Sequence, residues 1–129
     1  MIIVDTSVWI DHFNGKDTPE TQILSTALSG HMVATGDLIL LEVLQGFRSD
    51  QDYNIAKKYF ETLEQFEMLG IDMALKAAEN YRKLRKKGVT IRKSADVVIA
   101  SFCIQNAIPL LFCDKDFLPF VKHFKLQAV

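Results

Sequence analysis

The chain has 129 residues, 49% of them apolar and 24% charged, with a formal net charge of −1 at pH 7. These values predict one globular domain over residues 1–129 with a single core of ordinary size. The sequence shows no apolar run near the roughly 20 residues of a membrane span and no secretory leader pattern. We therefore expect a cytoplasmic protein that makes no membrane contact.

The first half of the chain alternates short apolar strands with helices. Residues 1–4 form an apolar run that fits a strand buried on both faces. The pattern predicts helices over 8–13 and 19–28, separated from the next helix by a short strand over 32–34. Residues 38–47 are apolar nearly all round, so they predict a helix that is largely buried.

The second half continues this alternation, which predicts an α/β domain of three layers, with a parallel sheet covered by helices on both faces. The expected elements are a helix beginning near residue 50, a strand over 66–69, an amphipathic helix over 72–87, a helix over 95–106, a strand over 108–113, a short helix over 114–121 and an edge strand over 125–129.

The cysteines and histidines give no sign of a soft-metal site. Cys103 and Cys113 lie in apolar stretches, which predicts buried, reduced thiols rather than a disulfide. His12, His31 and His123 are scattered without ligand spacing, so we do not expect zinc.

Three acids follow directly on predicted strands. Asp5 comes after the first strand, and Asp114 and Asp116 repeat this arrangement after the strand over 108–113. In an open parallel sheet, the carboxyl ends of the strands form the edge at which ligands bind. Each acid could instead cap or precede a helix, which is a common structural use of aspartate.

Two further acids lie within apolar helices. Asp96 shares a helix face with small apolar side chains, so it should point inward, where an unpaired carboxylate costs several kcal/mol. The structural alternative is a favourable acid in a first helical turn, worth roughly 0.3–1 kcal/mol. Glu42 interrupts the apolar helix over 38–47, where it could also belong to a polar stripe with Gln45 and Ser49.

Taken together, these acids predict a cation site. Strand ends and the following helix starts lie on one edge of a parallel sheet, and carboxylates gathered there raise one another's pKa unless a cation neutralises them. Ligands that are all oxygen select Mg²⁺ or Mn²⁺ over zinc. The chemistry that most often uses such a pocket is metal-assisted attack of water on a phosphodiester.

Four motifs in this order give the chain a family resemblance. They are Asp5 in MIIVDTS, Glu42 in LLEVLQG, Asp96 in SADVVIA and Asp114 in DKDF. The sequence resembles a PIN domain over essentially its whole length and, more narrowly, the VapC-type toxins of bacterial toxin–antitoxin pairs. One departure is Phe112, where many relatives carry Thr, Ser or His, so any polar contact from that position is lost while the metal site is unaffected.

The resemblance implies a PIN-like α/β/α fold with about five parallel strands and a Mg²⁺-dependent endoribonuclease that also accepts Mn²⁺. It further implies a homodimer, an RNA substrate and an inhibitory antitoxin protein. Asp5 and Asp96 would be direct metal ligands, with Asp116 as an adjunct ligand. Glu42 and Asp114 would complete the acidic quartet by orienting water or holding a second metal.

The same resemblance suggests residues that would contact RNA. Thr6 or Ser7 would offer a hydroxyl to a water or a phosphate in the site. Seven of the fifteen basic residues fall between positions 82 and 93, where they could hold the RNA backbone or merely form a solvated helix face. The candidates for this contact are Arg82, Arg85, Lys86, Lys87, Arg92 and Lys93.

Two other classes of function are weaker fits. A phosphotransfer or phosphatase domain would want a second acid close to Asp5, and Ser7 stands two residues beyond it. A non-catalytic PIN-like module that binds RNA or a partner would be expected to have lost some of the acids, and all of them are present.

Overall fold

The computed structural model describes residues 1–129 and contains one sheet of four parallel strands, in the order β3-β2-β1-β4. The strands are β1 (Ile2–Val4), β2 (Val33–Gly36), β3 (Glu64–Phe66) and β4 (Leu110–Leu111). The helices are α1 (Thr6–Phe13), α2 (Pro19–Ser29), α3 (Asp37–Gln45), α4 (Asp50–Glu61), α5 (Ile71–Lys86), α6 (Ser94–Gln105), α7 (Leu118–Phe124) and the 3-10 turn η1 (Lys115–Phe117).

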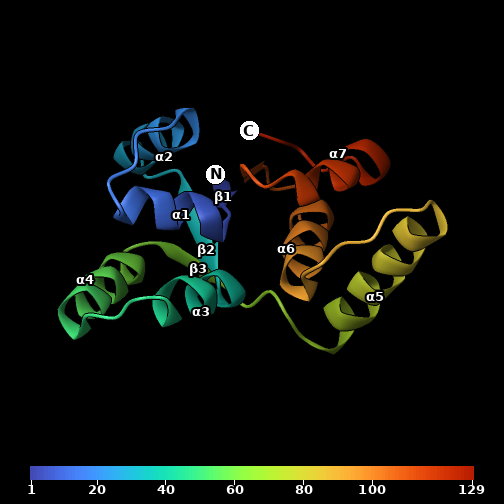
Figure 1. Ribbon diagram of the computed structural model, residues 1–129, viewed down its shortest axis with the longest axis horizontal. Coiled ribbons are helices and arrows are strands. Elements are labelled where there is room, and N and C mark those ends of the chain that lie inside the picture. The colour runs from blue at the N-terminus through green and yellow to red at the C-terminus, as the bar shows by residue number, and fades with distance from the viewer.

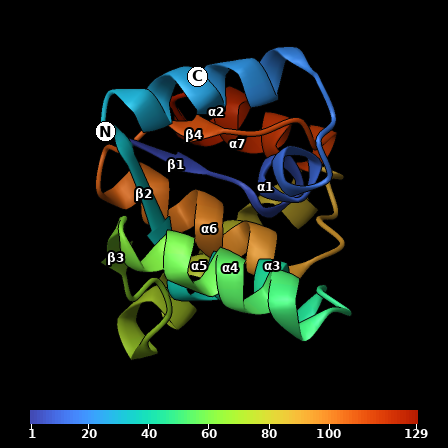
Figure 2. The same cartoon turned by 90° about the vertical axis from the view of Figure 1, so that its left-hand side faces the viewer.

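The helices form layers on the two sides of the sheet. Figure 1 shows α1, α2 and α4 on one side and α5, α6 and α7 on the other, and Figure 2 shows the strands between them. Ile3 and Val4 of β1 are fully buried, as expected for a central strand covered on both faces. The predicted three-layer α/β fold with a parallel sheet is therefore confirmed.

The most completely buried helix is α6, not α3. Eight consecutive residues of α6, from Asp96 to Cys103, are buried because α6 lies between the sheet and α5 (Figure 1). In α3 only Ile39 and Val43 are fully covered, and Leu41 is 58% exposed. The prediction that residues 38–47 are largely buried was wrong, since α3 lies at the border of its layer and presents one face to the core.

Two strand predictions also need correction. The third strand covers Glu64–Phe66 rather than 66–69, because Asp37 Oδ1 accepts a hydrogen bond from the Met68 amide (2.8 Å) and draws the chain away from the sheet. The expected fifth strand over 125–129 is reduced to a single parallel bridge between Leu110 and Ala128. The sheet thus has four strands where about five were expected.

None of the helices is both long enough and apolar enough to cross a membrane.

At Gly36, an added Cβ atom would clash with a buried side chain. A Cβ added there would lie 2.6 Å from Met68 Cε, so the buried Met68 side chain would have to shift. We expect Gly36→Ala to lower the free energy of unfolding by about 1–3 kcal/mol, the usual cost of overpacking. Gly70→Ala is the control, because a Cβ there meets nothing within 4 Å. Denaturant unfolding of both variants tests this, and equal stability would contradict it.

Candidate active site

The acids predicted from the sequence converge at the carboxyl edge of the sheet. Asp5 follows β1, Asp96 lies in the first turn of α6, and Glu42 is in the second turn of α3. Asp114 and Asp116 flank the start of η1, just after β4. Four separate segments of the chain therefore bring one carboxylate each, or a close pair, to a single region.

The tightest group consists of Asp96, Asp114 and Asp116. One carboxylate oxygen from each lies within 4.8 Å of the others, which is a spacing that a single metal ion can bridge. Asp114 Oδ1 also accepts a hydrogen bond from the Asp116 amide (2.9 Å) and so caps the η1 turn. The capping and ligand explanations for Asp114 are compatible, because its other oxygen stays available.

Asp5 is 3% exposed and lies at the N-cap position of α1 without making a capping hydrogen bond. The Ser7 hydroxyl donates to Asp5 Oδ2 (2.9 Å), while Asp5 Oδ1 has no partner. Burial raises the pKa of Asp5, against the opposing effect of Ser7 and the nearby amides, and the charge of Glu42 raises it further. A buried carboxylate oxygen with no donor is costly, so simple helix capping does not account for this residue.

Asp96 is in a similar position and is more strongly perturbed. It is 5% exposed, and its Oδ2 has no hydrogen-bond partner. Burial, followed by the charges of Asp5, Asp114 and Glu42, raises the pKa of Asp96 to about 7, although Lys93 opposes the shift. The expectation that Asp96 points inward is confirmed, and its surroundings are far from those of an ordinary first-turn acid.

Two hydroxyls hold carboxylates in place. Thr6 Oγ1 donates to Glu42 Oε1 (2.8 Å), so α1 and α3 are joined at the site, and Ser7 holds Asp5 as described above. These are the hydroxyls that the sequence suggested for a water or a phosphate. In this structure they orient acids of the site instead.

Cys113 was not predicted as a site residue, yet it lies beside Ser7 at the acidic edge. Its Sγ is 3.3 Å from Ser7 Oγ, and the residue is exposed. The prediction of two buried thiols is correct for Cys103 and wrong for Cys113. Because β4 has only two residues, the chain has already left the sheet at position 113. The apolar run over 108–113 carries no sign of this early end of the strand.

The basic residues divide into two groups. Arg92 Nε lies 3.4 Å from Asp116 Oδ2, and Lys93 is close enough to influence Asp96, so both lie at the rim of the acids. The exposed basic residues at the end of α5 lie elsewhere, since Figure 1 shows that end of α5 turned away from the start of α6. This second group comprises Arg82, Arg85, Lys86 and Lys87.

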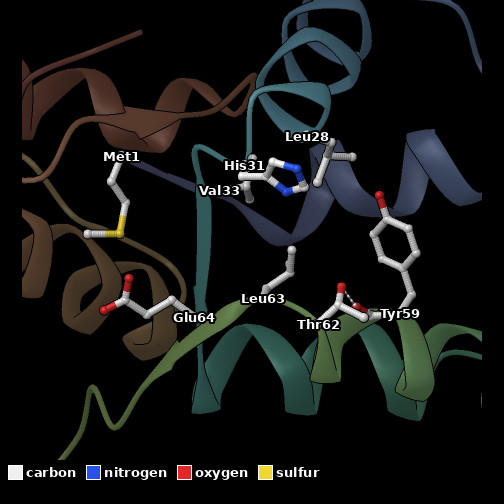
Figure 3. A pocket seen from close by; sticks show the side chains of 8 residues that line it. All are labelled: Met1, Leu28, His31, Val33, Tyr59, Thr62, Leu63 and Glu64. Atoms are coloured by element: carbon white, nitrogen blue, oxygen red, sulfur yellow. Dashed lines mark hydrogen bonds between the residues drawn. The ribbon is translucent and has the colours of Figure 1, made fainter.

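A surface cavity of about 520 Å³ lies at the opposite, amino edge of the sheet (Figure 3). Met1, Val33 and Glu64, near the starts of β1, β2 and β3, line it together with His31 and other side chains. Most of the side chains that line it are hydrophobic and only one is a carboxylate, so this cavity does not have the chemistry of a metal site. The buried carboxylate oxygens without a hydrogen-bond partner lie instead at the carboxyl edge of the sheet.

Comparison with known proteins agrees with this geometry. The family model described as "PIN domain" matches residues 2–120. The chain belongs to the PIN domain family. It is 30% identical to Ribonuclease VapC1 of Methanocaldococcus jannaschii, over 98% of this chain and 85% of that protein. It is 28% identical to VapC ribonuclease Mb1587 of Mycobacterium bovis, over 99% of this chain and 97% of that protein, which places it with the VapC proteins.

Solved structures show the same fold in PIN relatives. VapBC2 from Rickettsia felis, bound to a DNA fragment from its promoter, superposes with a TM-score of 0.78 at 19% identity, covering 100% of this chain and 98% of that chain. DNA-bound VapBC from Salmonella typhimurium gives a TM-score of 0.74 at 15% identity, again covering 100% and 98%.

The donor set of this PIN domain fits a hard divalent cation. Every candidate ligand in the group is a carboxylate oxygen, which Mg²⁺ and Mn²⁺ prefer. Asp5 Oδ1 and Asp96 Oδ2 are buried oxygens without a partner, and a cation would satisfy both. PIN-domain nucleases depend on metal, and this chain carries an acidic cluster (Asp5, Glu42, Asp96, Asp114 and Asp116) whose members Asp96, Asp114 and Asp116 are spaced to hold a metal ion.

The variant Asp96→Asn tests whether Asp96 is repelled by the neighbouring acids or is only a favourable acid in the first turn of α6. Because the folded-state pKa of Asp96 is about 7, above its ordinary 3.8, the metal-free protein loses stability from this group as pH rises from about 4 to 7. The variant should therefore be more stable than the parent at pH 8 in EDTA, by at most about 4 kcal/mol, since one pKa unit is worth ~1.4 kcal/mol. Stabilisation by Mg²⁺ should largely disappear.

Denaturant unfolding at pH 5 and pH 8, with EDTA or Mg²⁺, measures both effects. A first-turn acid without a metal role would behave differently. In that case the variant would lose roughly 0.3–1 kcal/mol and keep its response to Mg²⁺.

Proposed function

We propose that this chain is a Mg²⁺-dependent endoribonuclease that acts as the toxin of a toxin–antitoxin pair and cleaves single-stranded or loop RNA. The observation that carries the proposal is the pair of buried, unpartnered oxygens, Asp5 Oδ1 and Asp96 Oδ2, within a cluster of five acids in a PIN domain. Both VapC relatives named above bear the name ribonuclease, which supports RNA as the substrate.

Each acid has a distinct part in this proposal. When bound, the divalent cation activates water for attack on the phosphodiester and offsets the charge that develops on the phosphate. Asp5 and Asp96 would be direct ligands of this cation, and Asp114 and Asp116 would supply further carboxylate oxygens. Glu42 is oriented by Thr6 through a 2.8 Å hydrogen bond, which suits a group that directs a water or accepts its proton.

RNA would reach the site from the side on which Arg92 and Lys93 lie. Contacts between basic side chains and phosphates are independent of sequence and weaken with salt. Thr6 and Ser7 serve the substrate indirectly, by fixing Glu42 and Asp5. The basic residues at the end of α5 are candidates for contacts with more distant phosphates of a longer RNA.

Cleavage should require a divalent cation that prefers oxygen ligands. We expect cleavage of a mixed single-stranded RNA in Mg²⁺ or Mn²⁺, none in excess EDTA, and a loss of at least about 100-fold in Asp5→Asn, because removing one catalytic electrostatic group typically costs 10²–10³ in rate. Asp11→Asn is a matched control from the same helix region, outside the acidic cluster. Full activity of the parent in EDTA would refute the metal mechanism. RNA binding without cleavage would favour a non-catalytic PIN module.

The inhibitory partner is an antitoxin, in keeping with the VapBC complexes among the structural neighbours. A groove that is mainly apolar in its first part and partly polar in its second offers it a surface. Ile10, Phe13, Val43 and Phe47 line its first part, between α1 and α3, and Ile55 of α4 continues it. The groove starts one turn beyond Thr6 on α1 and next to Glu42 on α3, so an antitoxin segment lying in it would pass the acids.

We expect this segment to cover the acids with a cationic side chain, an arginine, which can pair with a carboxylate bidentately. The chain is also expected to form a homodimer and to act in the cytoplasm.

A charge placed in the groove should separate inhibition from catalysis. Ile10 and Ile55 are 41% and 59% exposed, so Ile10→Glu and Ile55→Glu should fold and cleave RNA. Both should bind the antitoxin at least about 10-fold more weakly, because losing an interface anchor costs about 1.4 kcal/mol or more of binding free energy. Ile23→Glu on α2 is the control, since Ile23 is 39% exposed and does not line the groove. The measurement is co-purification with the product of the adjacent reading frame. Unchanged binding by all three variants would exclude this groove.

A further inference from the structure

Arg92 is the residue whose side chain forms an ion pair with the acidic cluster. Its Nε lies 3.4 Å from Asp116 Oδ2, and the other two ion pairs in the structure join Glu79 to lysines of α5. Asp116 is one of the three acids with oxygens within 4.8 Å of one another. Arg92 therefore neutralises a carboxylate that a bound cation would also use.

The position of Arg92 is set by the backbone next to it and not by contacts of its own side chain. Ile91, the residue before Arg92, is 4% exposed and anchors the connection between α5 and α6 in the core. The Arg92 side chain is 77% exposed, whereas that of Asp116 is 22% exposed. A single long contact through Nε, with no bidentate partner, is a weak interaction for a guanidinium, so the head group can leave Asp116 without disturbing the fold.

We propose that Arg92 exchanges partners: it pairs with Asp116 in the metal-free protein and, once a divalent cation takes Asp116, moves to a phosphate oxygen of the bound RNA. This inference rests on the proposed nuclease function and adds a positioning residue to it. Arg92 would hold the phosphate close to the acids only when the site is loaded.

The electrostatics of the exchange require no other element to move. A guanidinium and a divalent cation at one carboxylate would repel each other, so Arg92 would leave Asp116 when the site is loaded. The nearest new anion in a loaded site is the RNA phosphate, and the planar guanidinium matches two phosphate oxygens better than an ammonium does. Because the backbone at Ile91 is fixed, the displaced side chain stays within reach of the cluster.

Two measurements on Arg92→Gln test the exchange. The first is the affinity for Mn²⁺ without RNA, measured by electron paramagnetic resonance. The variant should bind Mn²⁺ about 2- to 5-fold more tightly, because it lacks the exposed Arg92–Asp116 ion pair that competes with the metal ion for Asp116. The second is the salt dependence of binding to a short single-stranded RNA in Ca²⁺. The slope of log K against log salt should become shallower by roughly 0.7, the value for one phosphate contact on a single strand.

Two further variants serve as controls. Arg92→Lys keeps the charge and should restore most of the salt slope. Lys87→Gln removes a charge from an exposed position at the other end of the same connection, and its Mn²⁺ affinity should equal that of the parent.

The combination of results decides the outcome. Tighter Mn²⁺ binding together with the shallower slope supports the exchange. A shallower slope with unchanged Mn²⁺ affinity means a fixed phosphate contact, and tighter Mn²⁺ binding with an unchanged slope means a counter-ion only. Either result overturns the proposal, as does no change in both. A parent that neither binds nor cleaves RNA overturns the nuclease function itself, which separates the two failures.

Discussion

Repulsion among carboxylates at one edge of the sheet is the constraint on which the rest of this structure depends. Five acids converge there, and Asp5 and Asp96 are 3% and 5% exposed. Such a group opposes folding in the absence of a cation, so the surrounding core must be stable enough to hold it together. Asp5 follows β1, of which Ile3 and Val4 are fully buried, and Asp96 lies in the nearly enclosed α6, so both acids are attached to parts of the core best able to do so.

Neutral donors hold the cluster without removing its charge. Thr6 and Ser7 donate to Glu42 and Asp5 and fix their orientations, yet they add no positive charge that would compete with a metal ion. A lysine or arginine at either position would stabilise the metal-free protein more and weaken the affinity for a cation. The residues after β1 therefore favour function over stability, as is common at active sites.

Sequence reasoning identified the acids because their placement follows from local rules. A strand that ends in an acid puts that acid at the carboxyl edge, whatever the remaining packing, and this holds for Asp5 and Asp114. It failed where the outcome depends on which surfaces other elements cover. Both α3 and α6 are apolar nearly all round, and only the tertiary arrangement makes α6 the buried one and leaves Leu41 exposed. Likewise, Cys113 is exposed because β4 is short, which the apolar run over 108–113 did not reveal.

The balance of charge at the rim links metal binding to RNA binding. Arg92 and Lys93 face five acids, so the metal-free site is negative overall when the acids are ionised and would repel a phosphate. A divalent cation would offset two of these negative charges and would itself attract a phosphate oxygen, so the loaded edge would accept RNA more readily. RNA should in turn tighten the hold on the cation, because a coupling between two ligands is reciprocal. A site of this kind binds its substrate strongly only when it is ready to react.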